Sequence, residues 1–452
     1  MRILWLKSDL LLPLDKGGRL RTWHLMRHLA RRHEITYLAF VDPETPAEHI
    51  AGMREVAARV ETVVRRDPRK GSFSFYLDAA AHLLDPLPYA VGKYRSREYR
   101  QRLEALLGAD RPEARRDEQP FDLVVCDFLV PAVNLPTRLP CASVLFTHNV
   151  EAEIWRRHAE NKRGVLGRAL YSTQYRRMLR FERNVLARFD GVLAVSDADQ
   201  RTFARLYPGA VHRPIHVVPT GVDVRFFDAA QSDPASRKIV FTGSMDWLPN
   251  EDAMLYFCRD ILPIIRAEEP DIELAIVGRA PTPEVRRLAA ASGVRVTGTV
   301  DDVRPFVKEA AVYVVPLRIG GGTRLKIFEA MAMGKAIVST SVGAEGLPVA
   351  NGDHLLLADE PRAFARSVVR LLRDVPRRRQ LEAAARALVV ARYDWAAVSG
   401  ELEQALLRIA DAGSRNEDRS AVPSATAGAT LNPPSLDHAA IRNPQSAMQV
   451  SP

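Results

Sequence analysis

The 452-residue sequence is poor in cysteine, with only three such residues. Cys126, Cys141 and Cys258 stand far apart and form no Cys-x-x-Cys pair. The sequence therefore favours neither a disulfide framework nor a cysteine-bound zinc ion. We expect all three to be small buried apolar side chains.

Long hydrophobic runs are absent as well. No stretch approaches the roughly 20 apolar residues of a membrane span, and the apolar run at residues 3–6 is too short for the core of a signal peptide. The sequence thus predicts a protein of the cytoplasm.

The composition is that of an ordinary soluble globular protein, with 47% apolar and 26% charged residues. The chain is too long for a single hydrophobic core, so we expect two domains. A net charge of +9 favours an anionic partner such as a nucleotide, a phospholipid surface or a nucleic acid. A solvated arginine-rich surface explains the same charge.

Short apolar runs alternate with helical patterns along the chain. The first half predicts strands at residues 3–6, 34–40, 122–126, 143–146 and 191–195, and a helix at residues 18–32. The rhythm restarts with predicted strands at residues 238–243, 273–277, 295–297, 312–315 and 336–339. Continuous apolarity within each run indicates parallel strands that are covered by helices on both faces.

The pattern predicts an α/β fold of two doubly wound, Rossmann-like domains facing across a cleft. We place the first domain at residues 1–212 and the second at residues 213–392, with prolines at the hinge between residues 208 and 236. Residues 393–412 form a further helix, a candidate to cross back to the first domain. Residues 413–452 lack aromatic residues and read as a disordered tail.

The most informative segment is a glycine run between a buried strand and a helix. Gly320, Gly321 and Gly322 let backbone amides approach an anion, and Thr323 is a candidate N-cap. A diphosphate fits this place, and Arg324 and Lys326 are suited to neutralise its charge.

Glu329 lies three residues after Lys326, on nearly the same helix face. Its two carboxylate oxygens can accept hydrogen bonds from both hydroxyls of a ribose. A glycine run is often only a turn, and such charges are often a solvated helix face. Together, after a buried strand, they favour a nucleotide diphosphate site.

Over nearly all of residues 1–411 the sequence resembles the retaining GT-B glycosyltransferases of family 4. The resemblance is carried by Lys16-Gly-Gly-Arg19, Thr147-His-Asn-Val-Glu151, residues 218–223, Phe241-Thr-Gly243, Ile276-Val-Gly278 and residues 326–334. Residues 245–250 and 320–326 are similar to transferases that accompany bacterial exopolysaccharide and PEP-CTERM/exosortase loci.

The resemblance implies transfer of a sugar from a nucleotide diphosphate to a glycan or polyprenyl-diphosphate-linked acceptor, with retention and without a bound metal or other cofactor. Glu329 matches the second glutamate of the family's Glu-x7-Glu motif, but Gly321 replaces the first, and Ser244 replaces the usual arginine after the Phe-x-Gly turn. We hypothesise that Arg324 and Lys326 supply the missing positive charge.

The resemblance also places His148 beside the transferred sugar, although a lone histidine is more often structural. Gly17 and Gly18 have amides that can face the diphosphate, unless they form a plain loop. We assign Asp127 and Asn149 to the acceptor side, Asp127 to orient a hydroxyl.

Loops of the second domain are expected to border the donor. They contain Gly243, Ser244, Gly278, Arg279, Thr299 and Val300, while Glu345 is a candidate contact to the sugar or ribose. Their backbone would read the base, so the sequence does not reveal which base is bound.

Asp197-Ala-Asp199 matches the Asp-x-Asp metal motif of other sugar transferases, but we interpret it as a helix start capped by Ser196 and assign no metal ligand. Glu151 is a candidate cap of the helix that begins there.

Residues 156–188 contain ten arginines or lysines and two glutamates. They form either a basic amphipathic face for anionic lipid at the inner side of the plasma membrane or a packed helix with a solvated face. The basic segments lack a nucleic-acid reading motif, so we expect no nucleic-acid partner. The alternative functions are a GT-B nucleotide-sugar epimerase and a catalytically silent sugar- or lipid-binding scaffold.

Overall fold

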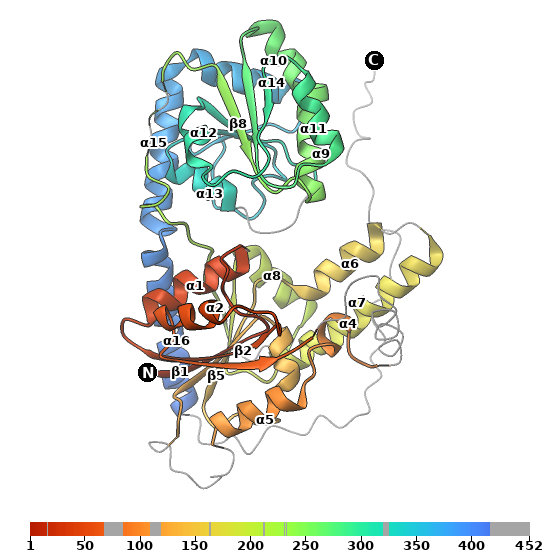
Figure 1. The fold of residues 1–452 in the computed structure, drawn as a ribbon, viewed down its shortest axis with the longest axis vertical. Coiled ribbons are helices and arrows are strands. Elements are labelled where there is room, and N and C mark those ends of the chain that lie inside the picture. The colour runs from red at the N-terminus through yellow and green to blue at the C-terminus, as the bar shows by residue number, and fades with distance from the viewer. Residues whose placement is uncertain are drawn as a thin grey trace, which may run out of the picture. The chain divides into compact units, whose positions relative to one another are not determined.

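The computed structural model describes residues 1–15, 17–66, 85–108, 119–161, 164–210, 213–229, 231, 233–319 and 325–415. Residues 1–414 form one compact unit. Its described part contains two parallel sheets with helices around them, as the sequence predicts (Figure 1). Among the described helices, none is long and apolar enough to span a lipid bilayer.

The first sheet has seven parallel strands in the order β3-β2-β1-β4-β5-β6-β7. The strands are β1 Arg2–Lys7, β2 Glu34–Val41, β3 Arg59–Val64, β4 Leu123–Asp127, β5 Ala142–Phe146, β6 Gly191–Ala194 and β7 Ile215–Val217. The five central strands confirm the prediction, because their apolar runs are buried on both faces. The prediction lacks the edge strands β3 and β7.

Helices and short helical turns connect these strands. They are α1 Gly17–Leu29, α2 Ala47–Gly52, η1 Met53–Glu55, α4 Tyr89–Gly92, α5 Arg97–Leu106, η3 Val130–Asn134, α6 Glu151–Asn161, α7 Val165–Leu186 and α8 Asp197–Leu206. Strand order reverses between β1 and β4, so the crevice where open α/β sheets bind ligands opens at their carboxyl ends.

The second sheet has six parallel strands in the order β10-β9-β8-β11-β12-β13. The strands are β8 Lys238–Thr242, β9 Glu273–Val277, β10 Val294–Val296, β11 Val312–Val315, β12 Ala336–Ser339 and β13 Leu356–Leu357. Here the order reverses between β8 and β11. All five predicted strands are confirmed to within a residue or two at their ends.

From β8 onward the described chain contains eight α-helical segments and two short helical turns. They are α9 Leu248–Tyr256, η4 Phe257–Ile261, α10 Leu262–Glu268, α11 Pro283–Arg287, η5 Leu288–Ala290, α12 Arg304–Glu309, α13 Leu325–Ala332, α14 Pro361–Arg373, α15 Val375–Arg392 and α16 Trp395–Arg415. The last of these, α16, belongs by its contacts to the first sheet.

Helix α16 completes the core on one face of the first sheet (Figure 1). Its apolar stripe contains Trp395, Val398, Leu402, Ala405, Leu406 and Ile409, which pack with Ile3, Trp5 and Leu25. The chain passes between the sheets twice, and the two crossings touch where Val222 pairs with Asp394. Of the predicted tail at residues 413–452, the structure describes only residues 413–415, as the end of α16.

A buried carboxylate fixes the start of α6. Glu182 of α7 accepts hydrogen bonds from the backbone amides of Glu151 (2.9 Å) and Ala152 (3.1 Å) and from the Tyr207 hydroxyl. Burial raises the pKa of Glu182 to about 7 in spite of these donors. The cap of α6 therefore comes from Glu182, 31 residues away in sequence, and Glu151 is the capped residue.

Cys126 and Cys141 are buried as expected, whereas Cys258 is only half-buried.

Candidate functional site

A buried ion pair lies at the reversal of strand order in the first sheet. Lys7 ends β1 and Asp127 ends β4, and their side chains are 1% and 0% exposed. The carboxylate oxygen Oδ2 of Asp127 accepts hydrogen bonds from Lys7 Nζ (2.9 Å), Trp5 Nε1 (3.0 Å) and Thr22 Oγ1 (2.6 Å). Burial alone would raise the pKa of Asp127, but Lys7 and the hydrogen bonds hold it well below its usual range.

His148 follows β5 and contacts the other oxygen of this carboxylate, with Nε2 2.6 Å from Asp127 Oδ1. Because an ionised carboxylate only accepts hydrogen bonds, Nε2 must carry the proton. Burial lowers the pKa of His148 to about 4 although Asp127 opposes the shift, so the ring is neutral near pH 7. Its second nitrogen, Nδ1, is then a hydrogen-bond acceptor.

An aromatic ring and a glycine fix the orientation of His148. Phe128 stacks on the imidazole with centroids 3.8 Å apart and planes 16° apart. A Cβ on Gly18 would lie 3.2 Å from the Phe128 ring and 3.9 Å from His148 Nδ1. Gly18 therefore allows close packing at the start of α1, whose first residue is Gly17.

The structure brings His148, Asp127 and Gly18 together. His148 and Asn149 line a cavity of about 590 Å³ within the compact unit, together with Phe328 and Glu345 from the connections of the second sheet. Asp127 does not line it: this carboxylate is enclosed behind His148 and touches no surface. An acceptor hydroxyl cannot reach it in this arrangement.

The Asp-x-Asp sequence forms the helix start that we predict. The Ser196 hydroxyl oxygen accepts the backbone amide of Asp199 at 3.1 Å, and Asp197 and Asp199 occupy the first turn of α8.

Glu329 lies on α13, the helix between β11 and β12 of the second sheet. It is half-buried and forms no hydrogen bond or ion pair with the residues that the structure describes. Burial raises the pKa of Glu329 to about 7, while the nearby charge of Lys326 opposes the shift. A carboxylate without a hydrogen-bonding partner among the described residues is suited to hydroxyl donors of a ligand.

Lys326 points back to the turn after β8. Its Nζ donates to Asn250 Oδ1 at 2.7 Å and lies 4.2 Å over the Phe241 ring. A Cβ on Gly243 would be 2.8 Å from this nitrogen, so a larger residue there would displace the ammonium group. The amide of Asn250 in turn donates to the Ser244 carbonyl at 2.8 Å. The ammonium group of Lys326 therefore lies next to Gly243 and Ser244.

Arg279 reaches the same turn, with Nε donating to Ser244 Oγ at 2.8 Å. Gly278, just before it, packs so tightly on the Gly243 carbonyl that no side chain fits. Thr299 and Val300 lie in the loop after β10, where Val300 packs against the second core.

Part of the predicted donor site lies outside the described residues. These positions are Gly320, Gly321, Gly322, Thr323 and Arg324. Their roles stay predictions.

Other residues of the site were missed by the sequence analysis: Lys7, Trp5, Thr22, Phe128 and Asn250. A lysine at the end of an apolar strand, as at Lys7, is an available signal. Phe128 offers none, because its backbone φ of 74° is a rare conformation for a residue with a side chain.

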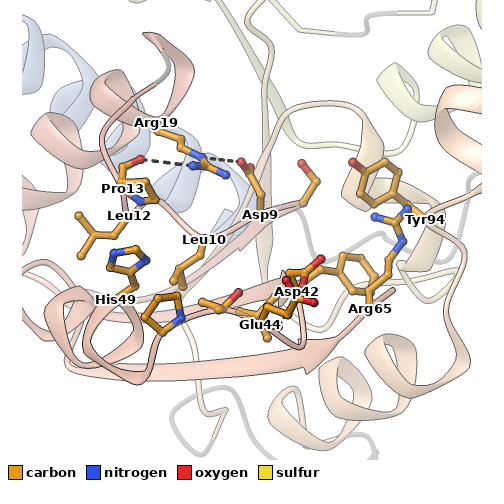
Figure 2. A pocket seen from close by; sticks show the side chains of 15 residues that line it. Asp9, Leu10, Leu12, Pro13, Arg19, Asp42, Glu44, His49, Arg65 and Tyr94 are labelled. Carbon is orange, nitrogen blue, oxygen red and sulfur yellow. Dashed lines mark hydrogen bonds and ion pairs between the residues drawn. The ribbon is translucent and has the colours of Figure 1, made fainter. Parts of the chain in front are cut away.

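A second cavity, of about 660 Å³, opens at the carboxyl ends of β1 and β2 (Figure 2). Its two lining arginines, Arg19 and Arg65, both contact other side chains of the protein. Arg19 donates to Asp9 (2.8 Å) and Asp15 (2.9 Å), and the Arg65 guanidinium lies 3.9 Å over the Tyr94 ring.

The acidic side chains Asp42 and Glu44 line this second cavity from the loop after β2. Carboxylates accept hydrogen bonds from hydroxyl groups. The cavity is therefore better suited to an uncharged hydroxyl-bearing ligand than to a phosphate.

Two family models match this chain. The model of Glycosyltransferase Family 4 matches residues 16–226, and that of Glycosyl transferases group 1 matches residues 236–374. Between them they cover all strands of the two sheets except β1.

Curated relatives include phosphatidyl-myo-inositol mannosyltransferases. That of Mycolicibacterium smegmatis is 32% identical over 234 residues, which cover 49% of this chain and 58% of the relative. That of Mycobacterium tuberculosis H37Rv is 31% identical over 240 residues, which cover 50% of this chain and 61% of the relative. The chain thus spans about three fifths of the length of these relatives.

Solved structures resemble nearly the whole described chain. Sucrose-phosphate synthase from Thermosynechococcus elongatus has a TM-score of 0.61 at 16% identity and covers 91% of this chain and 100% of its own. Anabaena HepE in complex with UDP and glucose has a TM-score of 0.60 at 16% identity, with 90% and 99% covered. The likeness establishes the GT-B fold.

Proposed function

Because the chain belongs to the family 4 glycosyltransferases, we propose that it transfers a sugar from a nucleotide diphosphate donor to a hydroxyl group of an acceptor. The observation that carries the proposal is the carboxylate of Glu329, which has no partner among the described residues and stands one helical turn from Lys326. The carboxylate would bind the ribose, and the ammonium group would face the diphosphate. UDP in complexes with HepE supports a nucleotide sugar as the donor class.

The charge distribution suits departure of a nucleoside diphosphate. Cleavage between the anomeric carbon and the phosphate passes through an oxocarbenium-like state and leaves negative charge on the departing oxygen. Lys326, with Arg279 beside it, would stabilise that charge at the turn of Gly243. His148 would accept a hydrogen bond from a hydroxyl of the sugar. Retention of configuration is expected from the family resemblance.

To test this function, the protein is screened by thermal unfolding against a panel of sugars linked to UDP, GDP and other nucleoside diphosphates. One member should raise the thermal unfolding midpoint, and the protein should release its nucleoside diphosphate. A silent scaffold would bind without releasing nucleotide, which would contradict the proposal. The family matches do not favour the epimerase alternative.

We also propose that the acceptor is a glycan or a lipid-linked glycan whose uncharged sugar enters the second cavity, beside Asp42 and Glu44 (Figure 2). In the same assay, methyl glycosides should increase nucleotide release more than sugar phosphates do. Equal stimulation by sugar phosphates would remove this assignment. A role in exopolysaccharide or surface polysaccharide synthesis is part of this proposal.

Peripheral contact with an anionic membrane is a further part of the proposal, and it rests on the start of α7. Val165 and Leu166 are 85% and 88% exposed, although both are large and apolar. Arg168, Arg176 and Arg180 follow along the exposed side of the same helix. The other side is packed, with Met178 in the first core. Exposed apolar side chains followed by arginines match the chemistry of a membrane surface.

Replacing Val165 and Leu166 together by aspartate should weaken binding to phosphatidylglycerol vesicles about tenfold or more, because the apolar area leaves the membrane and negative charge enters. Vesicle co-sedimentation measures the effect. Val390→Asp is the matched control, since Val390 is 43% exposed on α15. Unchanged binding of the double variant would contradict the membrane contact.

A further inference from the structure

Asp127 is enclosed by its own donors. Lys7, Trp5 and Thr22 contact one oxygen, His148 contacts the other, and the side chain is fully buried. A carboxylate without exposed surface cannot touch a substrate. Any effect of Asp127 on the reaction must pass through His148, the member of this group that lines the cavity.

We propose that Asp127 and Lys7 are positioning residues that hold His148 in its Nε2–H tautomer, with Nδ1 as an acceptor for a sugar hydroxyl. The inference rests on the proposed function and deepens it. A hydroxyl group can donate to Nδ1, whereas an ionised phosphate oxygen has no hydrogen to give. The pair therefore makes this edge of the site specific for a hydroxyl and unfavourable for an anion.

Lys7 is needed to keep Asp127 ionised beside His148, because burial favours the neutral form of a carboxyl group. A protonated Asp127 could donate to His148, and the imidazole would then expose N–H at Nδ1 in place of a lone pair. The ammonium group 2.9 Å from Asp127 Oδ2 prevents this. Lys7 also lies 4.4 Å over the Phe128 ring, so the ring that stacks on His148 is itself held.

The backbone at Phe128 supports a functional interpretation. A φ of 74° in a residue with a side chain is unfavourable and persists where the surroundings impose it. Here it places the aromatic ring between Lys7 and His148. Strain of this kind is concentrated at functional sites.

Positive charges near His148 also favour the neutral form of its imidazole. Arg21 of α1 is buried over the Phe146 ring, 4.4 Å from its centroid, and Phe146 in turn contacts His148. Both Arg21 and Lys7 lower the pKa of His148, whereas Asp127 raises it, and burial lowers it most. The imidazole stays neutral as a result.

The direct test is nitrogen NMR of protein labelled with ¹⁵N-histidine, which reports which ring nitrogen is protonated. His148→Gln identifies the signal among the 11 histidines. We expect wild-type His148 to carry its proton on Nε2 at pH 7. A proton on Nδ1 in the wild type would overturn the proposal, whatever the activity.

The variant test is Asp127→Asn, which keeps the shape and removes the charge. The asparagine oxygen would keep the donors Lys7, Trp5 and Thr22, so its NH2 group would face Nε2 and the tautomer should shift toward Nδ1–H. Nucleotide release with the donor found in the panel should fall about tenfold in kcat, because one hydrogen bond to the sugar is lost. The KM for the donor should change less than threefold. Retention of both the tautomer and kcat would overturn the proposal.

Asp122→Asn is the matched control, since Asp122 lies just before β4 and is paired with Arg2 at the surface. It should leave the tautomer and kcat unchanged. If Asp127→Asn fails to fold, the wild-type tautomer still decides the matter. Absence of nucleotide release with every donor would reject the proposed function and leave the tautomer measurement valid.

Discussion

Replacement of Glu329 by alanine is expected to raise the KM for the nucleotide sugar about 100-fold, with kcat within about threefold of the wild type. Hydrogen bonds to a charged group contribute about 1.5–3 kcal/mol each, and a ribose offers two hydroxyls. The ribose stays bound in the same way through the reaction, so the loss falls on KM. Steady-state kinetics with the donor from the panel measures both constants.

The matched control is Glu284→Ala, because Glu284 is an exposed glutamate on α11. It should leave the donor KM unchanged. An unchanged KM in Glu329→Ala itself would remove the ribose role and with it the main support of the proposed function.

The same residue gives the site a pH dependence. Burial raises the pKa of Glu329 to about 7, so the free protein holds a mixture of protonated and ionised carboxyl at that pH. The ionised form accepts both ribose hydrogen bonds, and kcat/KM for the donor should therefore rise as pH increases through about 7. This rise of kcat/KM with pH should be absent in Glu329→Ala, which would assign the titration to Glu329.

Replacement of Lys326 by methionine is expected to lower kcat about 100- to 1,000-fold, the loss typical of removing one group that stabilises developing negative charge. Methionine keeps the length of the side chain and can still pack on Phe241. The ammonium interaction strengthens as the diphosphate departs, so kcat should fall more than the donor affinity. Single-turnover nucleotide release measures the step.

Lys308→Met is the control for general loss of positive charge, since Lys308 of α12 pairs with Asp228 at the surface. A full kcat in Lys326→Met would place the phosphate charge on other residues, of which Arg279 and Arg324 are the next to test. A raised KM with a normal kcat would assign Lys326 to binding alone.

Much of the fold is predictable because its central strands are buried on both faces and therefore read as unbroken apolar runs. The edge strand β3 was not predicted because Arg59 and Glu61, which pair with each other, interrupt its apolar pattern.

Some residues of the candidate site can likewise be predicted from the sequence and others cannot. Glu329 and His148 are found from the sequence because local motifs surround them. The contacts of Asp127 with Lys7 join residues 120 apart, and those of Lys326 with Asn250 join residues 76 apart. Such pairings depend on which strands become neighbours, a choice that no local pattern contains. The positive φ of Phe128 is imposed by these neighbours too.

The return of α16 to the first sheet has a consequence for biosynthesis. Trp395, Leu402 and Leu406 complete a core that begins with Ile3 and Trp5. A ribosome adds roughly 5–20 residues per second, so the first sheet leaves it with one apolar face only partly covered, by α1, for many seconds until α16 is made. The nascent chain must be shielded during that interval, and a message cut short before residue 395 would yield a product prone to aggregation.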